Sequence, residues 1–407
     1  MGLRKRNKKR RGENNIMNYT RDELFSIAKR YNNSKRTYLI VNKKQAKYLP
    51  SKPSETFAMT NALAQKMWQS GVKDENTLVI GFAETATALG RLIADHFSQA
   101  FYLTTTREEI IGKCIEFKEE HSYVVEQRIA IEALSKTHSF NQVVFVDDEF
   151  TTGRTLRNLA QALLKEIPSL RNSKKFAVTV IDRTNEENKA KLKELGIEII
   201  SLLSFTDDNF EEQVKNIEIA EPKKVPEVSK EILTVERIGN IPNARLGYTC
   251  GGINTLAQNL LERYKNQIQQ ANNILVLGTE EFMAVPIYFA REIEKFGKSV
   301  VCHATARSPI GVLGTSQSKT LDGSIGRDES RSLAKNTTLT EYPIQEGYKL
   351  VSFYQKDRNT YLYSMNHYDL VFVLTDSKEI PKGAIKALSS LMSIYKNYNT
   401  KLIQFTD

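Results

Sequence analysis

The sequence predicts an α/β protein with mostly parallel sheets in two domains. From Met17 onward, short apolar runs alternate with amphipathic helical stretches, the pattern of parallel strands joined by crossover helices. The chain has 407 residues, more than one hydrophobic core usually holds, so we expect two domains. Its hydrophobic content of 40% and charged content of 26% are ordinary for a globular protein. No apolar run approaches the ~20 residues that span a bilayer, so we expect no membrane partner.

Six apolar runs predict the strands of the first domain, at residues 37–41, 77–81, 100–104, 143–146, 176–181 and 197–205. A helix is predicted after the fourth run, because Leu156, Leu159 and Leu163 recur on one helical face until Pro168 stops the helix. Residues 207–245 lose this periodicity and are charged and proline-bearing, which indicates a connection. The predicted organisation is a tail at 1–16, a first domain at 17–225, a linker at 226–245 and a second α/β domain at 246–407.

Most of the net charge of +10 lies in the first twelve residues. This segment, MGLRKRNKKRRG, carries seven basic residues and no acidic one, so the rest of the chain has a net charge of +3. Such a segment is typical of a disordered basic tail, and nucleic acid is expected to bind, if at all, only through it. No apolar segment follows it, so it is not a secretory signal. Cys114, Cys250 and Cys302 lack metal-ligand spacing, which favours reduced thiols and a cytoplasmic location.

The second domain repeats features of the first in the same order. An apolar strand, a glycine, two further residues, a glutamate and an amphipathic helix occur at 78–97 and again at 275–296. A strand ending in Thr-x-Arg follows each helix, and residues 368–377 stand where 140–149 stand in the first domain. Any two strand–loop–helix units share such features, but three correspondences in order favour a degenerate repeat.

The strongest motif is VVFVDDEFTTGRT at residues 143–155. It ends a strand and opens a helix, the position at which open parallel sheets bind ligands. Successive N–H groups at the start of a helix form an anion cradle, and Gly153 lets the backbone approach a phosphate. Asp147 and Asp148 can accept hydrogen bonds from vicinal ribose hydroxyls, while the cradle holds a 5′-phosphate. The spacing fits neither a Walker A loop nor a dinucleotide-binding fingerprint.

This motif resembles the PRPP-binding loop of type I phosphoribosyltransferases, which have a Rossmann-like parallel sheet. The resemblance implies that PRPP is held by eight residues: Asp147, Asp148, Glu149, Thr151, Thr152, Gly153, Arg154 and Thr155. It also places a pyrophosphate loop in GFAETATALG, with Gly81, Ala83, Glu84 and Thr85 facing the pyrophosphate. An acidic residue beside an anion requires a role with Mg²⁺ or in hydrogen bonding, and helix capping by Glu84 is an equal alternative.

Residues 105–135 would form the flap that closes over PRPP. The resemblance assigns Arg107 to the leaving group, although a solvated loop arginine is the alternative. His121 is the candidate acid/base or acceptor-recognition group, against an ordinary surface histidine. The purine-using relatives that hold hypoxanthine or guanine place an aspartate where this chain has Thr151, so hypoxanthine-type salvage is disfavoured.

The chain further resembles a bacterial phosphoribosyltransferase family from tellurite-resistance and stress-response gene clusters, in which a TRSP domain follows the catalytic domain. HATARSPIGV at 303–312 fits that second domain, although Ala306 stands where the name expects threonine. The second domain has lost the acidic pair and the Thr-Gly cradle, so we expect no PRPP site there. Its candidate residues for another small ligand or an anion are Gly278, Glu281, Thr305, Arg307 and Ser308, and the alternative is a dimerisation or product-handling domain.

The resemblance implies a Mg²⁺-dependent transfer from PRPP to a nucleobase-like acceptor with release of pyrophosphate, in a protein that commonly pairs as a homodimer. Asp147, Asp148, Arg107 and His121 are the expected catalytic residues. The metal is expected to have no direct protein ligand and to be carried by PRPP near Asp147 and Asp148. The first alternative is a regulator of the same fold that senses PRPP or nucleotides and binds nucleic acid or a protein partner. The second is lyase or hydrolase chemistry on a phosphoribosyl compound.

Overall fold

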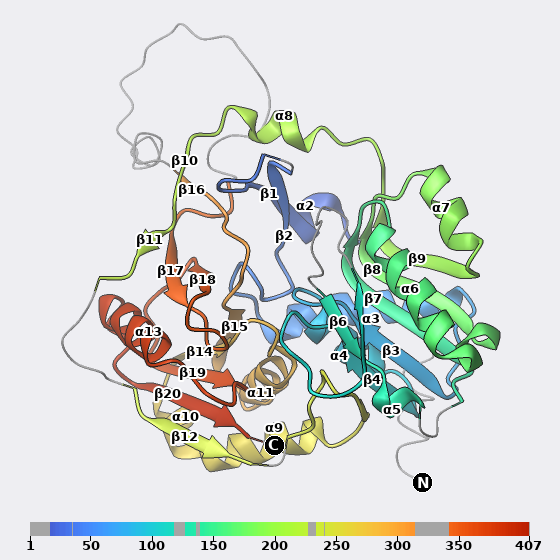
Figure 1. The fold of residues 1–407 in the computed structure, drawn as a ribbon. Coiled ribbons are helices and arrows are strands. Elements are labelled where there is room, and N and C mark those ends of the chain that lie inside the picture. The colour runs from blue at the N-terminus through green and yellow to red at the C-terminus, as the bar shows by residue number, and fades with distance from the viewer. Residues whose placement is uncertain are drawn as a thin grey trace, which may run out of the picture.

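The computed structural model describes residues 17–34, 36–117, 127–135, 139–226, 233–239, 241–313 and 342–406. Within these residues the chain forms two α/β halves that lie side by side, each built on its own sheet (Figure 1). We call residues 17–217 the first half and residues 218–406 the second half. Among the described residues no helix is long and apolar enough to cross a membrane. Cys114, Cys250 and Cys302 form no disulfide.

The first half contains the predicted parallel sheet. Its strand order is β13-β4-β3-β7-β8-β9, and the last five of these strands run parallel. The parallel strands are β3 (Thr77–Gly81), β4 (Ala100–Thr104), β7 (Gln142–Phe150), β8 (Lys174–Asp182) and β9 (Ile197–Ser204). Five of the six predicted strands are therefore confirmed in this sheet. The apolar runs of β3 and β4 are buried on both faces, as expected for strands covered by helices on each side.

Helices cover both faces of the first sheet. On one face lie α3 (Pro53–Gln69) and α4 (Thr87–Ala94), which contribute Met59, Leu63 and Ile93 to the core. On the other lie α6 (Arg154–Glu166) and α7 (Glu186–Lys193), and the apolar face of α6 is the one that the leucine spacing predicts. Shorter helical turns complete the half: α2 (Arg21–Leu24), α5 (Glu132–Ser135), η1 (Pro168–Asn172) and α8 (Phe210–Lys215).

The predicted strand at 37–41 lies outside the parallel sheet. Residues Tyr38–Asn42 form β2, which pairs antiparallel with β1 (Phe25–Lys29) in a separate ladder. The predicted strand is confirmed, but its antiparallel partner was not predicted, because an apolar run predicts a buried strand without identifying the strand it pairs with. A second antiparallel pair, β5 (Cys114–Phe117) with β6 (Gln127–Ala130), forms the base of the predicted flap.

The second half has a sheet of five parallel strands in the order β12-β20-β19-β14-β15. These strands are β12 (Val235–Ile238), β14 (Asn273–Gly278), β15 (Ser299–Ala304), β19 (Leu370–Thr375) and β20 (Thr400–Phe405). One face is covered by α9 (Ile253–Arg263), α10 (Lys265–Gln270) and α11 (Ala284–Lys295), and the other by α13 (Lys382–Ile394). An antiparallel hairpin, β17 (Gly347–Val351) and β18 (Asn359–Tyr363), stands beside this sheet.

The two sheets share a strand order. The run β4-β3-β7-β8 of the first half corresponds to β15-β14-β19-β20 of the second, and the paired strands come in the same order along the chain. This agrees with the sequence correspondences, while duplication itself stays a prediction. Two short strands ahead of the predicted boundary at residue 225 belong to the second half by pairing: β10 (Ile219–Ala220) with β16 (Val312–Leu313), and β11 (Lys223–Lys224) with β17.

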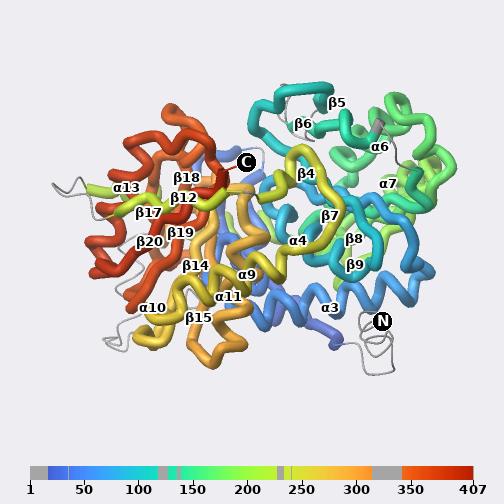
Figure 2. The backbone as a smooth tube through the Cα atoms, turned by 90° about the horizontal axis from the view of Figure 1, so that it is seen from below, coloured from blue at the N-terminus to red at the C-terminus, as the bar shows by residue number. Residues whose placement is uncertain are grey.

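The halves meet along two helices. Figure 2 shows α4 and α11 between the two sheets. Ala88 and Leu92 of α4 pack into the hydrophobic core of the second half. Asp95, just after α4, contacts Arg91 on α4 and Tyr288 on α11. The interface therefore combines apolar burial with a polar cluster.

Candidate active site

The acidic pair lies at the carboxyl end of β7. The amide of Asp148 donates to Asp147 Oδ1 at 2.9 Å, and Thr85 Oγ1 donates to Asp148 Oδ1 at 2.8 Å. Burial raises the pKa of both carboxyl groups, and the charge of Asp148 raises the pKa of Asp147 further. Two carboxyl groups with raised pKa values at the end of a central strand are unfavourable for the protein alone, which points to a ligand that donates hydrogen bonds to them.

The loop after the acidic pair turns directly into α6. Gly153 is the N-cap residue of this helix and has a left-handed conformation with φ of 65°. Thr151, Thr152 and Thr155 are half-buried and Arg154 is exposed. The amide of Arg154 donates to Thr152 Oγ1 at 3.2 Å. The start of a 13-residue helix thus follows the acidic pair by a few residues, as an anion cradle requires.

We predict that Gly153→Ala costs about 1–2 kcal/mol in the free energy of unfolding, because an L-residue is strained in the left-handed region, and that it also weakens PRPP binding. Gly196→Ala is the matched control: Gly196 has φ of 69°, and a Cβ there meets nothing within 4 Å. It is expected to show the backbone strain alone, with unchanged PRPP binding and a smaller stability cost than Gly153→Ala, because a Cβ at Gly153 also meets Leu192 Cδ1 at 2.9 Å. Urea unfolding and calorimetry would measure the two effects, and equal PRPP affinity in both variants would refute the cradle.

The predicted pyrophosphate loop runs along the neighbouring strand end. It is held by its backbone: the amide of Phe82 donates to Val146 O at 2.9 Å, and the amide of Ala83 donates to Thr105 Oγ1 at 2.8 Å. A Cβ at Gly81 would lie 2.9 Å from the carbonyl oxygen of Ala86, so the loop folds back onto the strand only with glycine there. Thr85, whose hydroxyl reaches Asp148, joins this loop to the acidic pair.

Glu84 does not cap the helix. Helix α4 begins at Thr87, and its N-cap Ala86 has no side-chain cap. The Glu84 carboxylate instead forms an ion pair with Lys47 and accepts a hydrogen bond of 3.2 Å from the amide of Arg307 in the second half. The capping alternative is therefore wrong. The carboxylate is 8% exposed and Lys47 is 1% exposed, so both charges are buried against each other.

Sequence reasoning missed three cations that the first 50 residues supply. Arg36 and Lys47 lie in a stretch that is rich in basic residues. The sequence of this stretch does not distinguish the lysines and arginines that are buried from those that are solvated. The third cation, Arg30, is close enough to Arg36, Glu149 and Arg107 for their charges to act on it. Burial lowers the pKa of Arg30, and Arg36 lowers it further. Among the described residues Arg30 has no carboxylate within ion-pair distance, and its Nε is buried without a hydrogen-bond partner.

Glu149 is engaged by two arginines. Arg36 Nη2 lies 2.6 Å from one carboxylate oxygen and Arg183 Nη1 lies 2.5 Å from the other. Arg183 also pairs with Asp208 at 2.7 Å and donates to the hydroxyl of Tyr38 at 2.6 Å. Glu149 thus holds Arg36 beside the acidic pair, and its direct contact with PRPP stays a prediction.

Two of the predicted catalytic residues lie in the flap region. The amide of Arg107 donates to Glu281 Oε1 of the second half at 3.0 Å, so its backbone is fixed at the interface. His121 lies outside the described residues. Its predicted role stays untested.

In the second half, the carboxylate that corresponds to the acidic pair is already bound by other side chains of the protein. Asp376 directly follows β19, and by strand register it stands where Asp148 stands on the equivalent strand β7, while Thr375 takes the place of Asp147. Its carboxylate accepts a hydrogen bond of 2.5 Å from the hydroxyl of Tyr354, which lies on the loop between β17 and β18, and pairs with Arg245 at 2.5 Å. These contacts explain physically why the second half is not expected to bind PRPP: its carboxylate already has a hydroxyl donor and a cation.

Three of the second-half candidates, Glu281, Thr305 and Arg307, belong to one network of contacts. The amide of Glu280 donates to Thr305 Oγ1 at 3.0 Å, next to the tight turn at Gly278. Arg307 contacts the carboxylates of Glu84, Glu108, Glu280 and Glu281. The main-chain oxygen of Ser308 accepts a hydrogen bond of 2.8 Å from Tyr363. Burial would raise the pKa of Glu281, but Arg245 and Arg307 outweigh it and lower this pKa to about 2.

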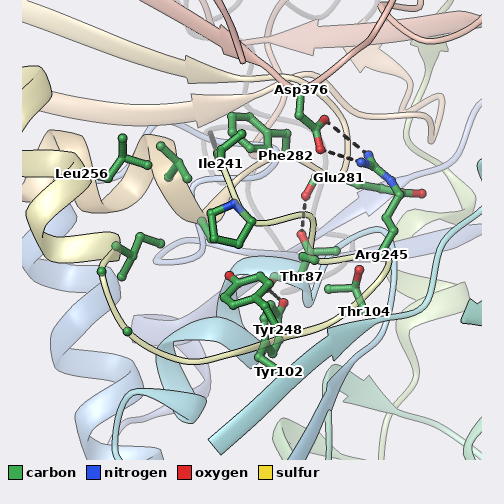
Figure 3. Close-up of a pocket in the computed structure, with 17 residues that line it drawn as sticks. Thr87, Tyr102, Thr104, Ile241, Arg245, Tyr248, Leu256, Glu281, Phe282 and Asp376 are labelled. Carbon is green, nitrogen blue, oxygen red and sulfur yellow. Dashed lines mark hydrogen bonds and ion pairs between the residues drawn. The ribbon is translucent and has the colours of Figure 1, made fainter. Parts of the chain in front are cut away.

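A cavity of about 270 Å³ lies between the halves (Figure 3). Its wall is mainly apolar and comes from α4, β4, α9, α11 and the segment 241–252, with the Arg245–Glu281–Asp376 ion pairs at one end. None of its lining residues belongs to β7 or to the loop at 151–155. The cavity is therefore separate from the acidic pair.

Comparison with known families agrees with the division into halves. Residues 24–206 match a family described as phosphoribosyl transferase. Residues 242–319 match a family described as the TRSP domain, C-terminal to that transferase domain. A comparison with curated proteins found no match.

Solved structures with a similar chain course include adenine phosphoribosyltransferases. The enzyme from Rhodothermus marinus shows 11% identity and a TM-score of 0.32, covering 45% of this chain and 94% of that one. The enzyme from Trypanosoma brucei, in complex with AMP, pyrophosphate and ribose-5-phosphate, shows 12% identity and a TM-score of 0.33, covering 46% of this chain and 82% of that one. The enzyme from Giardia lamblia with 9-deazaadenine shows 13% identity and a TM-score of 0.32, covering 46% and 96%.

Proposed function

We infer that this chain, which carries a phosphoribosyl transferase domain followed by a TRSP domain, transfers a phosphoribosyl group from PRPP to a nitrogen of a nucleobase-like acceptor. One observation carries the proposal. Thr85 of the loop after β3 donates to Asp148 at the end of β7, so the loop for a pyrophosphate and the carboxylates for a ribose meet at one sheet edge. The start of α6 follows within the same turn.

Each part of PRPP has a chemically matched partner. Asp147 and Asp148, two half-buried carboxylates side by side, accept further hydrogen bonds from the ribose hydroxyls. The N–H groups at the start of α6, with the hydroxyls of Thr152 and Thr155, hold the 5′-phosphate. The backbone of residues 82–85 faces the pyrophosphate. Arg30, which has a buried Nε without a hydrogen-bond partner among the described residues, supplies positive charge nearby.

The residues present fit a magnesium ion that arrives with PRPP. Among the described residues no group of three His, Cys, Asp or Glu side chains could hold a metal ion. The oxygens of Asp147 and Asp148 are the donor type that Mg²⁺ prefers, and phosphate oxygens supply the rest of such a site. When bound, the ion neutralises charge on the departing pyrophosphate.

The transfer breaks the bond between C1′ and the pyrophosphate oxygen, which keeps the electron pair. The acceptor nitrogen forms the new bond to C1′ and loses its proton to a base or to solvent. The chain's contribution is to orient ribose and pyrophosphate, to place positive charge near the leaving group and to exclude water. Thr151 bears no ionisable group, so we propose that the acceptor is not held as in hypoxanthine-type enzymes. A homodimer, tail-mediated nucleic-acid binding, a cytoplasmic location and a role in tellurite or stress response stay predictions.

The test is release of pyrophosphate from Mg²⁺-PRPP. The full chain is incubated with PRPP and, separately, with each member of a panel of purines, pyrimidines and metabolite extracts, and product nucleotides are identified by mass spectrometry. We expect pyrophosphate and a new phosphoribosyl product in equal amounts with at least one acceptor. PRPP binding without release for any acceptor would favour the sensing alternative, and pyrophosphate release with ribose 5-phosphate as the product would favour hydrolysis.

A further inference from the structure

The two halves cover each other's sheet edges. Strand β4 ends the parallel part of the first sheet, and β13 (Tyr248–Thr249) of the second half pairs antiparallel with it. Strand β15 ends the second sheet, and Ser51 of the first half bridges to Cys302 on it, with hydrogen bonds of 2.9 and 2.8 Å. Each half therefore gives a short segment to the equivalent edge strand of the other, as two subunits of a symmetric dimer do.

The same reciprocity joins the loops after β3 and β14. Glu84 is the third residue after Gly81, and it accepts from the amide of Arg307 at 3.2 Å. Glu281 is the third residue after Gly278, and it accepts from the amide of Arg107 at 3.0 Å. Each glutamate thus holds the Thr-x-Arg segment of the other half. The contact of Glu84 with Arg307 and the contact of Glu281 with Arg107 are thus related by an approximate two-fold symmetry within one chain.

The symmetry ends at the ligand loops. The first half has Asp147 and Asp148 without a cationic partner in the described residues, whereas the carboxylate of Asp376 is taken by Tyr354 and Arg245. The second half therefore packs against the first as a partner whose own carboxylate, Asp376, is already bound by protein side chains. Arg307, 7% exposed, is a basic residue of this partner that contacts Glu84 of the pyrophosphate loop.

We propose that the second half acts as a built-in partner subunit and that Arg307 is a positioning residue for the pyrophosphate loop. This inference rests on the proposed function. An ionised Glu84 would repel a pyrophosphate bound to its own loop. Lys47 pairs with one of its oxygens, while the Arg307 amide and guanidinium lie at 3.2 and 3.7 Å from the other. The guanidinium also pairs with Glu280 of the second half at 2.8 Å. It therefore holds the pyrophosphate loop of the first half against the second half.

The experiment compares two ligands on the full chain. Mg²⁺-PRPP uses the pyrophosphate loop, whereas ribose 5-phosphate uses only the acidic pair and the cradle. Calorimetry on Arg307→Met is expected to show PRPP binding weakened on the order of ten- to a hundredfold, because misplacement of a binding group by about 1 Å has effects of that size. Ribose 5-phosphate affinity is expected to stay within about twofold of wild type, and Arg307→Lys to lie between the two for PRPP.

Arg358→Met is the matched control. Arg358 shares Glu108 and Glu280 with Arg307, at 2.5 and 2.9 Å, and no contact between it and Glu84 is present. It is expected to keep wild-type affinity for both ligands. Equal PRPP affinity in wild type and Arg307→Met, or an equal loss of both ligands, would overturn the positioning role; if that variant does not fold, the same criteria apply to Arg307→Lys. Wild type that binds no PRPP would instead refute the proposed function itself.

Discussion

Asp147→Asn is expected to abolish detectable PRPP binding while stabilising the ligand-free protein at neutral pH. Hydrogen bonds to charged groups contribute about 1.5–3 kcal/mol each, so losing the ionised acceptor and disturbing its neighbour weakens binding by about a hundredfold or more. The stability change has the opposite sign because the variant removes one of two adjacent, half-buried like charges. Burial and the charge of Asp148 raise the pKa of Asp147 in the folded protein.

The pH dependence of this stabilisation has a defined sign. Because the folded Asp147 holds its proton more tightly than the unfolded residue, whose pKa is about 3.9, its contribution falls as pH rises from about 4 towards the raised folded value. The buried His303, whose pKa burial lowers to about 4, gives the opposite slope between about 4 and 6.5. The readout is therefore the difference between Asp147→Asn and wild type in urea unfolding, and we expect it to grow from pH 4 to pH 7.

Asp182→Asn is the control for this prediction. Asp182 ends the adjacent strand β8, but its carboxylate accepts hydrogen bonds from the amide of Thr184 at 2.9 Å and the hydroxyl of Ser204 at 3.2 Å. This variant should lose stability, because the carboxylate is already satisfied by the protein. If Asp147→Asn were also less stable than wild type at pH 7, the acidic pair would be a structural feature rather than a ligand site.

Glu149→Gln is expected to lower the free energy of unfolding by about 3–5 kcal/mol, the usual effect of removing one member of a buried ion pair. Glu149 is 11% exposed and Arg183 is 9% exposed, so the two guanidinium groups would lose their shared anion with little access to water. Burial alone would raise the pKa of Glu149, but Arg36 and Arg183 outweigh it and lower the pKa. Its stabilising contribution is present above the unfolded pKa of about 4.3 and is lost as pH falls through the lowered folded value.

Chemical denaturation of the full chain measures this effect. Glu198→Gln is the matched control, because Glu198 lies exposed on β9 in the same sheet and its replacement should change stability by no more than about 0.5 kcal/mol. A loss below about 1 kcal/mol for Glu149→Gln would mean that the two arginines find other partners. In that case Glu149 would be available to contact PRPP directly, as the sequence predicts.

The strands of the first sheet could be predicted closely. Residues 77–81 and 100–104 have the bounds that their apolar runs predict, because strands buried on both faces leave a continuous apolar signal. The acidic pair and Gly153 could also be found, since each serves a local need: a strand end, a left-handed turn and a helix start. Residues 38–42 show the limit, because their burial was predictable while their antiparallel partner was not.

The features that follow from the order of residues are local: the strands, the helix faces, the acidic pair and the glycine that turns the chain into α6. The long-range contacts became visible in the folded chain: Lys47 is buried against Glu84, Arg307 reaches a loop more than 200 residues earlier, and Tyr354 donates a hydrogen bond to Asp376. The physical reason is that periodicity and turn chemistry depend on neighbouring residues. Ion pairs between the halves depend on which sheet edges meet. The letter for a lysine is the same whether its side chain is solvated or, like that of Lys47, 1% exposed.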